Sequence, residues 1–423
     1  MEERKKFRNL MNVMDLNGFY LIANKKITNG HVLTVGIPPT GTFSDFEKKK
    51  EQLENYFRGI IELEKTRFSS SLQVKIITKD VGNYLYEPTR PNKYSSLFVG
   101  KKFDGEPYFI DLNKDAHILI AGKTGTGKSF LLATILTNLI YHHNKQYDIY
   151  LCQTNKRDID YLKNCKGIKA SLYTAKETAT MLDKAVKEIN TRAEYFARVG
   201  AKGLDHYNKV TNKRLKRKIF VFEEISLYMT DVTDTTEEKK YKTQVWSNVW
   251  KIVKLGREVG IHFIGLSQRT TAANLGGSGE IKSQLCRITF KQSQELDSRN
   301  CIDSDLAITL SDRECYILGN DGLILVKVPT TDKEMKLLQK YVPEIITVAT
   351  VGQAPKKQIK LIRRTIERFD KYSDTPTTHQ NGSGSREFLG NKDIEKAKTG
   401  YKKSKLGAKK GVILEDVAVA EER

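Results

Sequence analysis

Long apolar runs are missing from this chain of 423 residues. A helix that spans a bilayer needs about 20 mostly apolar residues, and no stretch approaches that length. The most apolar helical candidate, residues 130–140, is short and is interrupted by threonine and asparagine. The charged N-terminus, MEERKKFRNLMNVMD, has no apolar core, so we expect no signal peptide. We therefore expect a cytoplasmic protein, and any association with a membrane would have to come through a partner.

Cysteine is also sparse, and its spacing excludes two kinds of site. The chain has an odd number of cysteines, widely spaced and without a Cys-x-x-Cys pair: Cys152, Cys165, Cys286, Cys301 and Cys315. Neither a disulfide framework nor a zinc site has this pattern, which is typical of a protein in a reducing compartment.

Acidic residues are outnumbered by basic ones, 51 against 72, which gives a formal net charge of +21. A large positive charge is typical of proteins that bind a polyanion, because each lysine or arginine that neutralises a phosphate releases a counterion. The alternative is a solvated, lysine-rich surface, since charge argues for association and not for fold.

The pattern of apolar residues divides the chain into three regions. Residues 1–107 predict a small α+β domain, with strands at 18–27, 31–35 and 72–78 and a helix from Ser44 to about Lys65. Residues 108–352 predict a larger domain, and residues 353–423 a basic, largely disordered tail that includes a flexible linker at 381–385.

The larger domain alternates short apolar strands with helices. Strands are expected at 117–121, 149–153, 219–222, 262–266, 288–291 and 323–328, and helices at 128–143, 176–199 and 243–259. This alternation predicts an α/β fold with a doubly wound, mostly parallel sheet.

The segment GKTGTGKS, residues 122–129, matches the phosphate-loop pattern G-x-x-x-x-G-K-[ST]. The apolar segment HILIA precedes it and SFLLATILTNLI follows, which is the strand–loop–helix setting that the pattern needs. A glycine-rich turn with a solvated lysine is the alternative. We expect ATP to contact Gly122, Lys123, Thr124, Gly125, Thr126, Gly127, Lys128, Ser129 and Phe130. Within this set Lys128 would reach the β- and γ-phosphates, and Ser129 would bind Mg²⁺.

Two adjacent acids follow a buried strand further along the chain, in KIFVFEE, residues 218–224. Doubly wound sheets bind ligands at the carboxyl ends of their strands, so these acids are candidates for the metal and the attacking water. We assign Glu223 to Mg²⁺ and Glu224 to the water. Asp-Glu is the usual pair, so the assignment could shift by one position, and two exposed glutamates are the alternative. Gln268, at the end of the strand expected at 262–266, is a candidate sensor of the γ-phosphate.

With these strands in order, the chain resembles the motor domain of the FtsK/SpoIIIE DNA translocases, within the FtsK–HerA group of ring ATPases. The resemblance is carried by the phosphate loop, the Glu223–Glu224 strand, LGREVGIH (255–262), SQR (267–269), RITF (287–290), DSR (297–299) and RAEYFARVGAKGLDHYN (192–208). It implies a RecA-like P-loop NTPase core, and more weakly the family's small domain before residue 110.

The resemblance also implies a homohexameric ring that moves duplex DNA by ATP hydrolysis. Arg257 and Arg287 become candidates for charge stabilisation across the subunit interface, and an ion pair with a nearby acid is the alternative for each. Pore contacts are expected from residues 270–279. Lys239, Lys240 and Lys242 are candidate DNA-backbone contacts or a solvated charge run.

The chain departs from the family in two ways, since neither a membrane-spanning N-terminus nor a C-terminal winged-helix module is recognisable. A plasmid, phage or conjugative-element translocase fits this better than a chromosome translocase. A relaxase, a replication protein or a membrane channel is then a candidate partner of the tail. Two other functions stay open: an FtsK-like ATPase for protein secretion, and a non-hydrolysing, nucleotide-switched DNA-binding protein, if Glu223 cannot replace aspartate.

Overall fold

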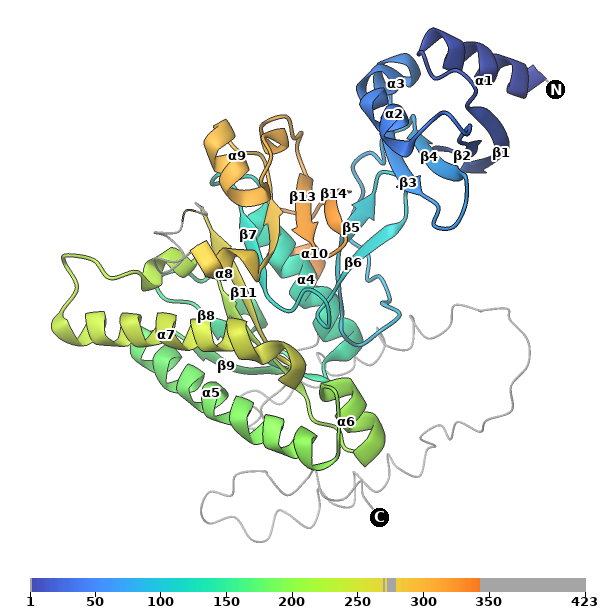
Figure 1. Cartoon of the computed structure of the whole chain (residues 1–423). Coiled ribbons are helices and arrows are strands. Elements are labelled where there is room, and N and C mark those ends of the chain that lie inside the picture. Colours follow the sequence, from blue (N-terminus) through green and yellow to red (C-terminus); the bar gives the residue numbers. More distant parts are fainter. Residues whose placement is uncertain (1, 269–270, 272–278, 343–423) are drawn as a thin grey trace, which may run out of the picture. The chain divides into compact units, whose positions relative to one another are not determined.

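The computed structural model describes residues 2–268, 271 and 279–342. The basic tail expected at 353–423 and most of the expected pore segment therefore lie outside the described residues. Those that are described form two β-sheets, one of four strands and one of ten (Figure 1).

The four-stranded sheet belongs to the first 77 residues. Its elements are α1 (Glu2–Val13), β1 (Tyr20–Ile27), β2 (Gly30–Gly36), α2 (Phe43–Lys48), α3 (Lys50–Phe57), β3 (Ile60–Lys65) and β4 (Ser71–Ile77). The strands are antiparallel in the order β1-β2-β4-β3. Phe46 and Leu53 from the helices pack on Val35, Ile61 and Leu72 from the strands and form the core of this part.

The helix expected from Ser44 to about Lys65 is present as α2 and α3 up to Phe57, and the prediction is wrong beyond that residue. Thr42 caps α2 through a capping box with Asp45, and the helical segment ends at Arg58, which has a left-handed φ of 50°. Ile60 and Ile61 match a helical spacing in the sequence, yet they begin β3, where pairing with β4 satisfies their backbone. Pairing with β4 determines that this segment is a strand, and the local spacing of apolar residues carries no information about that pairing.

The ten-stranded sheet contains the strands expected between residues 117 and 328. Its strands are β5 (Ser96–Lys102), β6 (Pro107–Asp111), β7 (Ile118–Ala121), β8 (Tyr147–Cys152), β9 (Ile168–Leu172), β10 (Arg217–Phe222), β11 (Ile261–Ser267), β12 (Cys286–Thr289), β13 (Glu314–Gly319) and β14 (Gly322–Lys327). The order is β6-β5-β14-β13-β12-β7-β11-β10-β8-β9. Strands β12, β7, β11, β10, β8 and β9 run parallel, and the other four are antiparallel. The predicted α/β fold with a mostly parallel sheet is confirmed.

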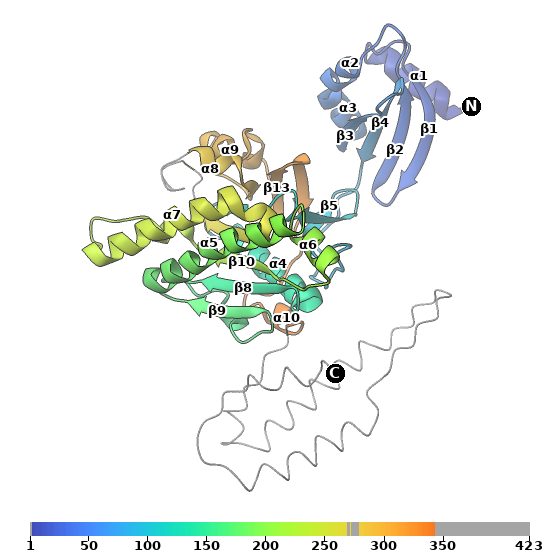
Figure 2. The same cartoon turned by 60° about the horizontal axis from the view of Figure 1, so that its bottom comes forward.

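Helices cover both faces of this sheet. The longer ones are α4 (Lys128–His143), α5 (Ala175–Arg198) and α7 (Thr236–Val259), and the shorter ones are α6 (Leu204–Thr211), α8 (Gly279–Ser283), α9 (Glu295–Ile302) and α10 (Lys336–Gln339). Both views place α5 and α7 alongside each other (Figures 1 and 2). Alternate residues of β10 face opposite cores: Ile219 packs with the residues of α4, and Phe220 with those of α5 and α7. A strand buried on both faces reads as a continuous apolar run, which explains why KIFVF was recognisable in the sequence.

The parallel register brings four strand ends to one edge of the sheet. Ala121 at the end of β7 lies opposite Ser267 in β11 and Thr289 in β12, and Phe222 at the end of β10 lies opposite Gly265. We call this the carboxyl edge, and the opposite side, where the same strands begin, the amino edge. The phosphate loop, the acidic pair and Gln268 all follow strands that end at the carboxyl edge.

Candidate nucleotide-binding site

The phosphate loop joins β7 to α4 in a conformation that its glycines make possible. Gly122, Gly125 and Gly127 have φ values of 144°, 84° and 112°, a region that side chains strongly disfavour. A Cβ on Gly122 would lie 2.9 Å from Thr126 Oγ1 and 3.0 Å from Phe290 Cβ. Gly127 stands at the N-cap of α4 and offers no side-chain cap. The first N–H groups of α4 are thus left to an anion, as a phosphate-binding helix requires.

Lys128 is buried at the start of α4 and folds back on its own loop. Its Nζ donates to the carbonyl oxygens of Gly122, at 2.6 Å, and of Lys123, at 3.0 Å. Burial lowers the pKa of Lys128 to about 8, the Glu224 carboxylate opposes this, and Lys156 adds to it. A lysine held by loop carbonyls can exchange these partners for phosphate oxygens without any change in the fold.

The two acids after β10 have different partners. Glu223 is almost fully buried, and its Oε1 accepts a hydrogen bond from the backbone N–H of Ile159 at 2.7 Å. Burial raises the pKa of Glu223 to about 7, although the hydrogen bond from Ile159 opposes the shift. Glu224 accepts from the Ser226 hydroxyl at 2.7 Å and lies close enough to Lys128 to stabilise its charge. Of the two acids, Glu224 is electrostatically coupled to the phosphate-loop lysine, in keeping with a place next to bound phosphates.

A loop that the sequence analysis did not select also reaches the phosphate loop. It follows β8, and in it Asp158 Oδ2 accepts a hydrogen bond from the Ser129 hydroxyl at 3.1 Å. Lys156 Nζ lies 3.4 Å from Ser129 Oγ and 3.4 Å from Asp158 Oδ2. The available signal was topological: β8 is a parallel strand next to β10, so polar residues after it belong at the carboxyl edge.

The other expected nucleotide contacts lie around the same loop. The Thr126 hydroxyl donates to the Lys123 carbonyl at 2.7 Å, while Lys123 and Thr124 are exposed. Phe130 is in the first turn of α4, with the guanidinium of Arg313 5.0 Å from the centre of its ring. Gln268 is exposed directly after β11, whose last residue, Ser267, pairs with Ala121 at the end of β7.

The two candidate arginines lie away from the phosphate loop of their own chain. Arg287 sits within β12, and its guanidinium forms an ion pair with Asp303, at 2.7 and 3.3 Å, as the alternative for this residue anticipated. Arg257 lies near the end of α7 and donates from Nε to the backbone carbonyl of Asn113, at the amino edge. A role at a subunit interface stays a prediction for both.

The expected DNA contacts are described only in part. Lys239 and Lys240 are exposed near the start of α7, whereas Lys242 is half-buried in an ion pair with Asp234 at 2.7 Å. Of the expected pore segment, residues 270 and 272–278 lie outside the described residues. All five cysteines lie in the described part of the chain and are buried, and none of them forms a disulfide there.

The side chains at the carboxyl edge fit a magnesium ion. In the described part of the chain, no group of three or more histidine, cysteine or acidic side chains could hold a metal without help. Mg²⁺ seldom needs such a cage, because it keeps several waters and is bound by one or two protein oxygens together with the phosphates of a nucleotide. The Ser129 hydroxyl and a nearby carboxylate meet that requirement.

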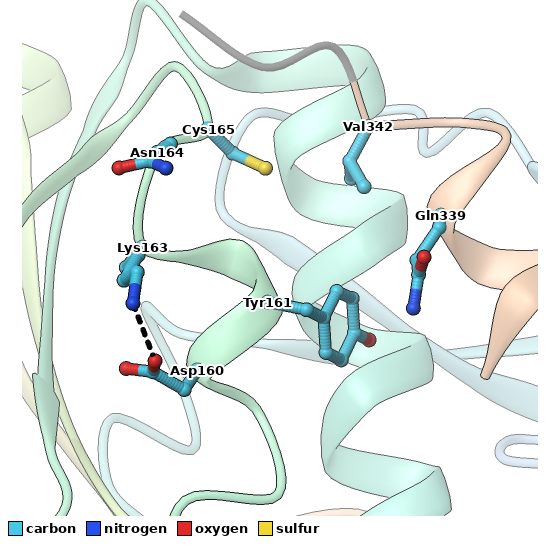
Figure 3. A pocket seen from close by; sticks show the side chains of 7 residues that line it. All are labelled: Asp160, Tyr161, Lys163, Asn164, Cys165, Gln339 and Val342. Carbon is cyan, nitrogen blue, oxygen red and sulfur yellow. Dashed lines mark hydrogen bonds and ion pairs between the residues drawn. The ribbon is translucent and has the colours of Figure 1, made fainter. Parts of the chain in front are cut away.

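A separate pocket lies next to this site, between the segment after β8 and the region of α10. Figure 3 shows its lining residues, with the ion pair between Asp160 and Lys163 at 2.8 Å. The others are Tyr161, Asn164, Cys165, Gln339 and Val342. It contains none of the residues that the sequence predicts for nucleotide binding, so the pocket and the phosphate loop are distinct features.

Known proteins share parts of this architecture. Residues 87–271 match the FtsK/SpoIIIE family. The chain is 28% identical over 230 residues to the DNA translocase FtsK of Caldanaerobacter subterraneus subsp. tengcongensis, covering 52% of this chain and 31% of that protein. It is 29% identical over 213 residues to the DNA translocase SftA of Bacillus subtilis, covering 48% of this chain and 21% of that protein. The matches thus span about a third or less of these relatives.

A solved structure matches more of the chain. The pCW3 conjugation coupling protein TcpA, in its monomer form with ATPγS, aligns with a TM-score of 0.56 and 20% identity, covering 81% of this chain and 99% of that one. At this identity the likeness concerns the fold, that of a P-loop ATPase. None of the described helices is long and apolar enough to cross a membrane. The predicted resemblance is confirmed: the chain contains an FtsK/SpoIIIE-type motor domain.

Proposed function

We propose that the chain is an ATPase that uses ATP hydrolysis to move DNA. The observation that carries the proposal is the arrangement at the carboxyl edge of an FtsK-type sheet. There a phosphate-loop lysine, a hydroxyl suited to Mg²⁺ and a glutamate coupled to that lysine lie beyond the carboxyl ends of parallel strands. The net charge of +21 supports a polyanionic cargo.

In the proposed reaction the protein positions ATP and stabilises developing charge. The N–H groups of the phosphate loop and Lys128 Nζ bind the β- and γ-phosphates, and Glu224 orients the attacking water. Ser129 would hold Mg²⁺, which would supply positive charge beside the phosphate oxygens. Gln268 would respond to the γ-phosphate, and the support is that it follows Ser267, which pairs with Ala121 directly before the phosphate loop. Arg257 or Arg287 of a neighbouring subunit would complete the site in a hexameric ring.

We further propose that this motor serves a plasmid, phage or conjugative element. The support is the likeness in fold to the solved chain of the conjugation coupling protein TcpA, of which this chain covers 99%. A relaxase, a replication protein or a membrane channel is then the expected partner of residues 353–423.

The test is ATPase activity of the full chain with duplex DNA, with single-stranded DNA and without DNA, between about 50 and 200 mM salt. We expect duplex DNA to stimulate turnover at low salt and the stimulation to fall steeply with salt, because phosphate contacts release counterions. Mass photometry with ATPγS should detect a hexamer. An ATPase rate that DNA does not change at any salt concentration would contradict the proposal.

A non-hydrolysing nucleotide switch is a second candidate, favoured by one observation. Glu223, in the place of the usual aspartate, is buried and hydrogen-bonded to Ile159. If no carboxylate served Mg²⁺, ATP would bind without turnover. Phosphate release that disappears in both Lys128→Ala and Glu224→Gln would exclude this candidate.

A further inference from the structure

The hydroxyl expected to bind Mg²⁺ is in contact with an acid outside the expected acidic pair. Ser129 Oγ donates to Asp158 Oδ2 at 3.1 Å, whereas Oε1 of Glu223 is engaged by the N–H of Ile159 at 2.7 Å. Glu223 is almost fully buried, and Asp158 is substantially exposed, with 44% of its side chain accessible. An exposed carboxylate beside the hydroxyl can reach an ion that keeps its waters; a buried one already bonded to the backbone is poorly placed for this.

From this arrangement we propose that Asp158 supplies the protein carboxylate of the magnesium site, and that Glu223 is a positioning residue. The inference rests on the proposed nucleotide function and refines it. Glu223 holds the backbone of Ile159, the residue directly after Asp158, and so fixes the loop that carries Asp158 to Ser129. A glutamate reaches this N–H across the strand end, which gives the extra methylene at position 223 a structural purpose.

Lys156 gives the site its charge balance before an ion binds. Its Nζ lies 3.4 Å from Asp158 Oδ2 and 3.5 Å from the backbone carbonyl of Glu223. An ammonium group therefore stands close to the carboxylate, where a divalent cation would later stand. With the ion and the phosphates in place, Asp158 would hold Mg²⁺ in place of the lysine, and Lys156 would be free to contact a phosphate oxygen.

The experiment measures metal affinity without hydrolysis or DNA. The full chain is mixed with ATPγS and titrated with Mn²⁺ in place of Mg²⁺, and free Mn²⁺ is followed by its EPR signal. Asp158→Asn should weaken Mn²⁺ binding by about tenfold or more, in the range typical of lost metal-site partners. The matched control is Asp160→Asn, two residues further on, whose carboxylate bonds to Lys163 and Tyr173 and should leave the affinity unchanged.

Glu223 is tested by a pair of variants. The amide oxygen of Glu223→Gln can still accept from Ile159, so this variant should bind Mn²⁺ almost as the wild type does. Glu223→Ala loses the anchor and should weaken binding, so recovery in the glutamine variant separates positioning from ligation.

Three results would overturn the assignment. Asp158→Asn could bind Mn²⁺ as well as Asp160→Asn does, or Glu223→Gln could weaken binding as much as Asp158→Asn. A wild-type chain that binds no Mn²⁺–ATPγS would overturn the nucleotide function as well. If the chain binds metal as expected but DNA does not change its ATPase rate, the translocase proposal is contradicted and the assignment of Asp158 is unaffected.

Discussion

Arg217 and Lys128, buried at opposite edges of the large sheet, have different kinds of hydrogen-bond partners. At the amino edge, the buried Arg217 donates to Asn113 Oδ1 at 2.8 Å and Asp205 Oδ2 at 2.8 Å, and its Nη1 lies 3.1 Å from His262 Nε2. These partners come from three separate segments of the chain. At the carboxyl edge, Lys128 is held by carbonyl oxygens of its own loop.

The difference separates a structural network from a binding site. Long-range partners at the amino edge fix one arrangement, and removing the central cation leaves the buried His262 ring and two exposed side chains without their shared partner. The partners of Lys128 at the carboxyl edge are local, and Lys128 can exchange them for a ligand at little cost to the fold. Substitutions at the carboxyl edge should therefore change activity, and substitutions at the amino edge should change stability.

Lys128→Ala should have the largest effect. Loss of a preorganised cation at the phosphates should lower the ATPase rate about 100-fold or more. The free energy of unfolding should stay the same or rise, because a buried lysine with a lowered pKa is removed. Phosphate release and urea denaturation check the two expectations. Lys145→Ala, an exposed lysine just after α4, is the control and should change neither. A loss of stability large enough to explain the lost activity would mean that Lys128 stabilises the fold, as the amino-edge residues do.

Glu224→Gln should separate binding from hydrolysis. The amide oxygen can keep the hydrogen bond from Ser226, but an amide cannot act as a base or hold the water as a carboxylate does. We expect turnover to fall about 100-fold, within the range of general-base catalysis, while ATPγS still binds. Single-turnover phosphate release and equilibrium binding of ATPγS test this. Glu237→Gln, on the exposed side of α7, should behave as the wild type.

Arg217→Met tests the other edge. The substitution keeps the apolar stem but leaves the buried His262 without its partner, while Asn113 and Asp205 are exposed and can turn to water. The free energy of unfolding should therefore fall by about 2 kcal/mol, the cost of one buried polar atom left unpaired. Urea denaturation measures the fall, and ATPγS affinity per folded molecule should not change. The exposed Arg214 provides the control, since Arg214→Met should leave stability within about 0.5 kcal/mol. A variant that stays stable yet loses nucleotide affinity would erase the distinction between the edges.

Residues whose role follows from a local pattern were predictable from the sequence. The phosphate loop has a fixed spacing, and β10 a run of apolar residues that ends in two acids. Strand β9 was missed because its sequence, IKASL, contains polar residues, and its place beside β8 depends on tertiary pairing.

The contacts of the site were less predictable, because they depend on loops. Asp158 reaches Ser129 through a loop in which Asn155 has a left-handed φ of 58°, and no spacing rule encodes that path. The partner of Arg287, Asp303, became identifiable only once α9 was placed against β12. From the sequence, an ion pair was one of two alternatives for Arg287, and the acid that forms it could be identified only in the folded chain.

The smallest expected effect concerns pH at the amino edge. Burial lowers the pKa of His117 to about 3, with a further contribution from Arg257, and holds the pKa of His262 well below its usual value. The folded state therefore keeps both rings neutral, while the unfolded chain binds protons below pH 6.5. Since the unfolded state then holds more protons, stability is complete above pH 6.5 and falls as the pH drops toward 3, by about 1 kcal/mol per histidine at pH 5.5.

His117→Asn should make the fall between pH 7.5 and 5.5 smaller by about 1 kcal/mol, because the asparagine does not titrate. Its oxygen can take the place of Nδ1, which accepts from the Phe263 N–H. Urea denaturation followed by tryptophan fluorescence reports on this sheet directly, since Trp246 and Trp250 both lie on α7. His206→Asn removes an exposed histidine and should leave the pH dependence unchanged. An identical fall in the wild type and His117→Asn would mean that acid acts elsewhere, so that the amino edge is structural without being sensitive to pH.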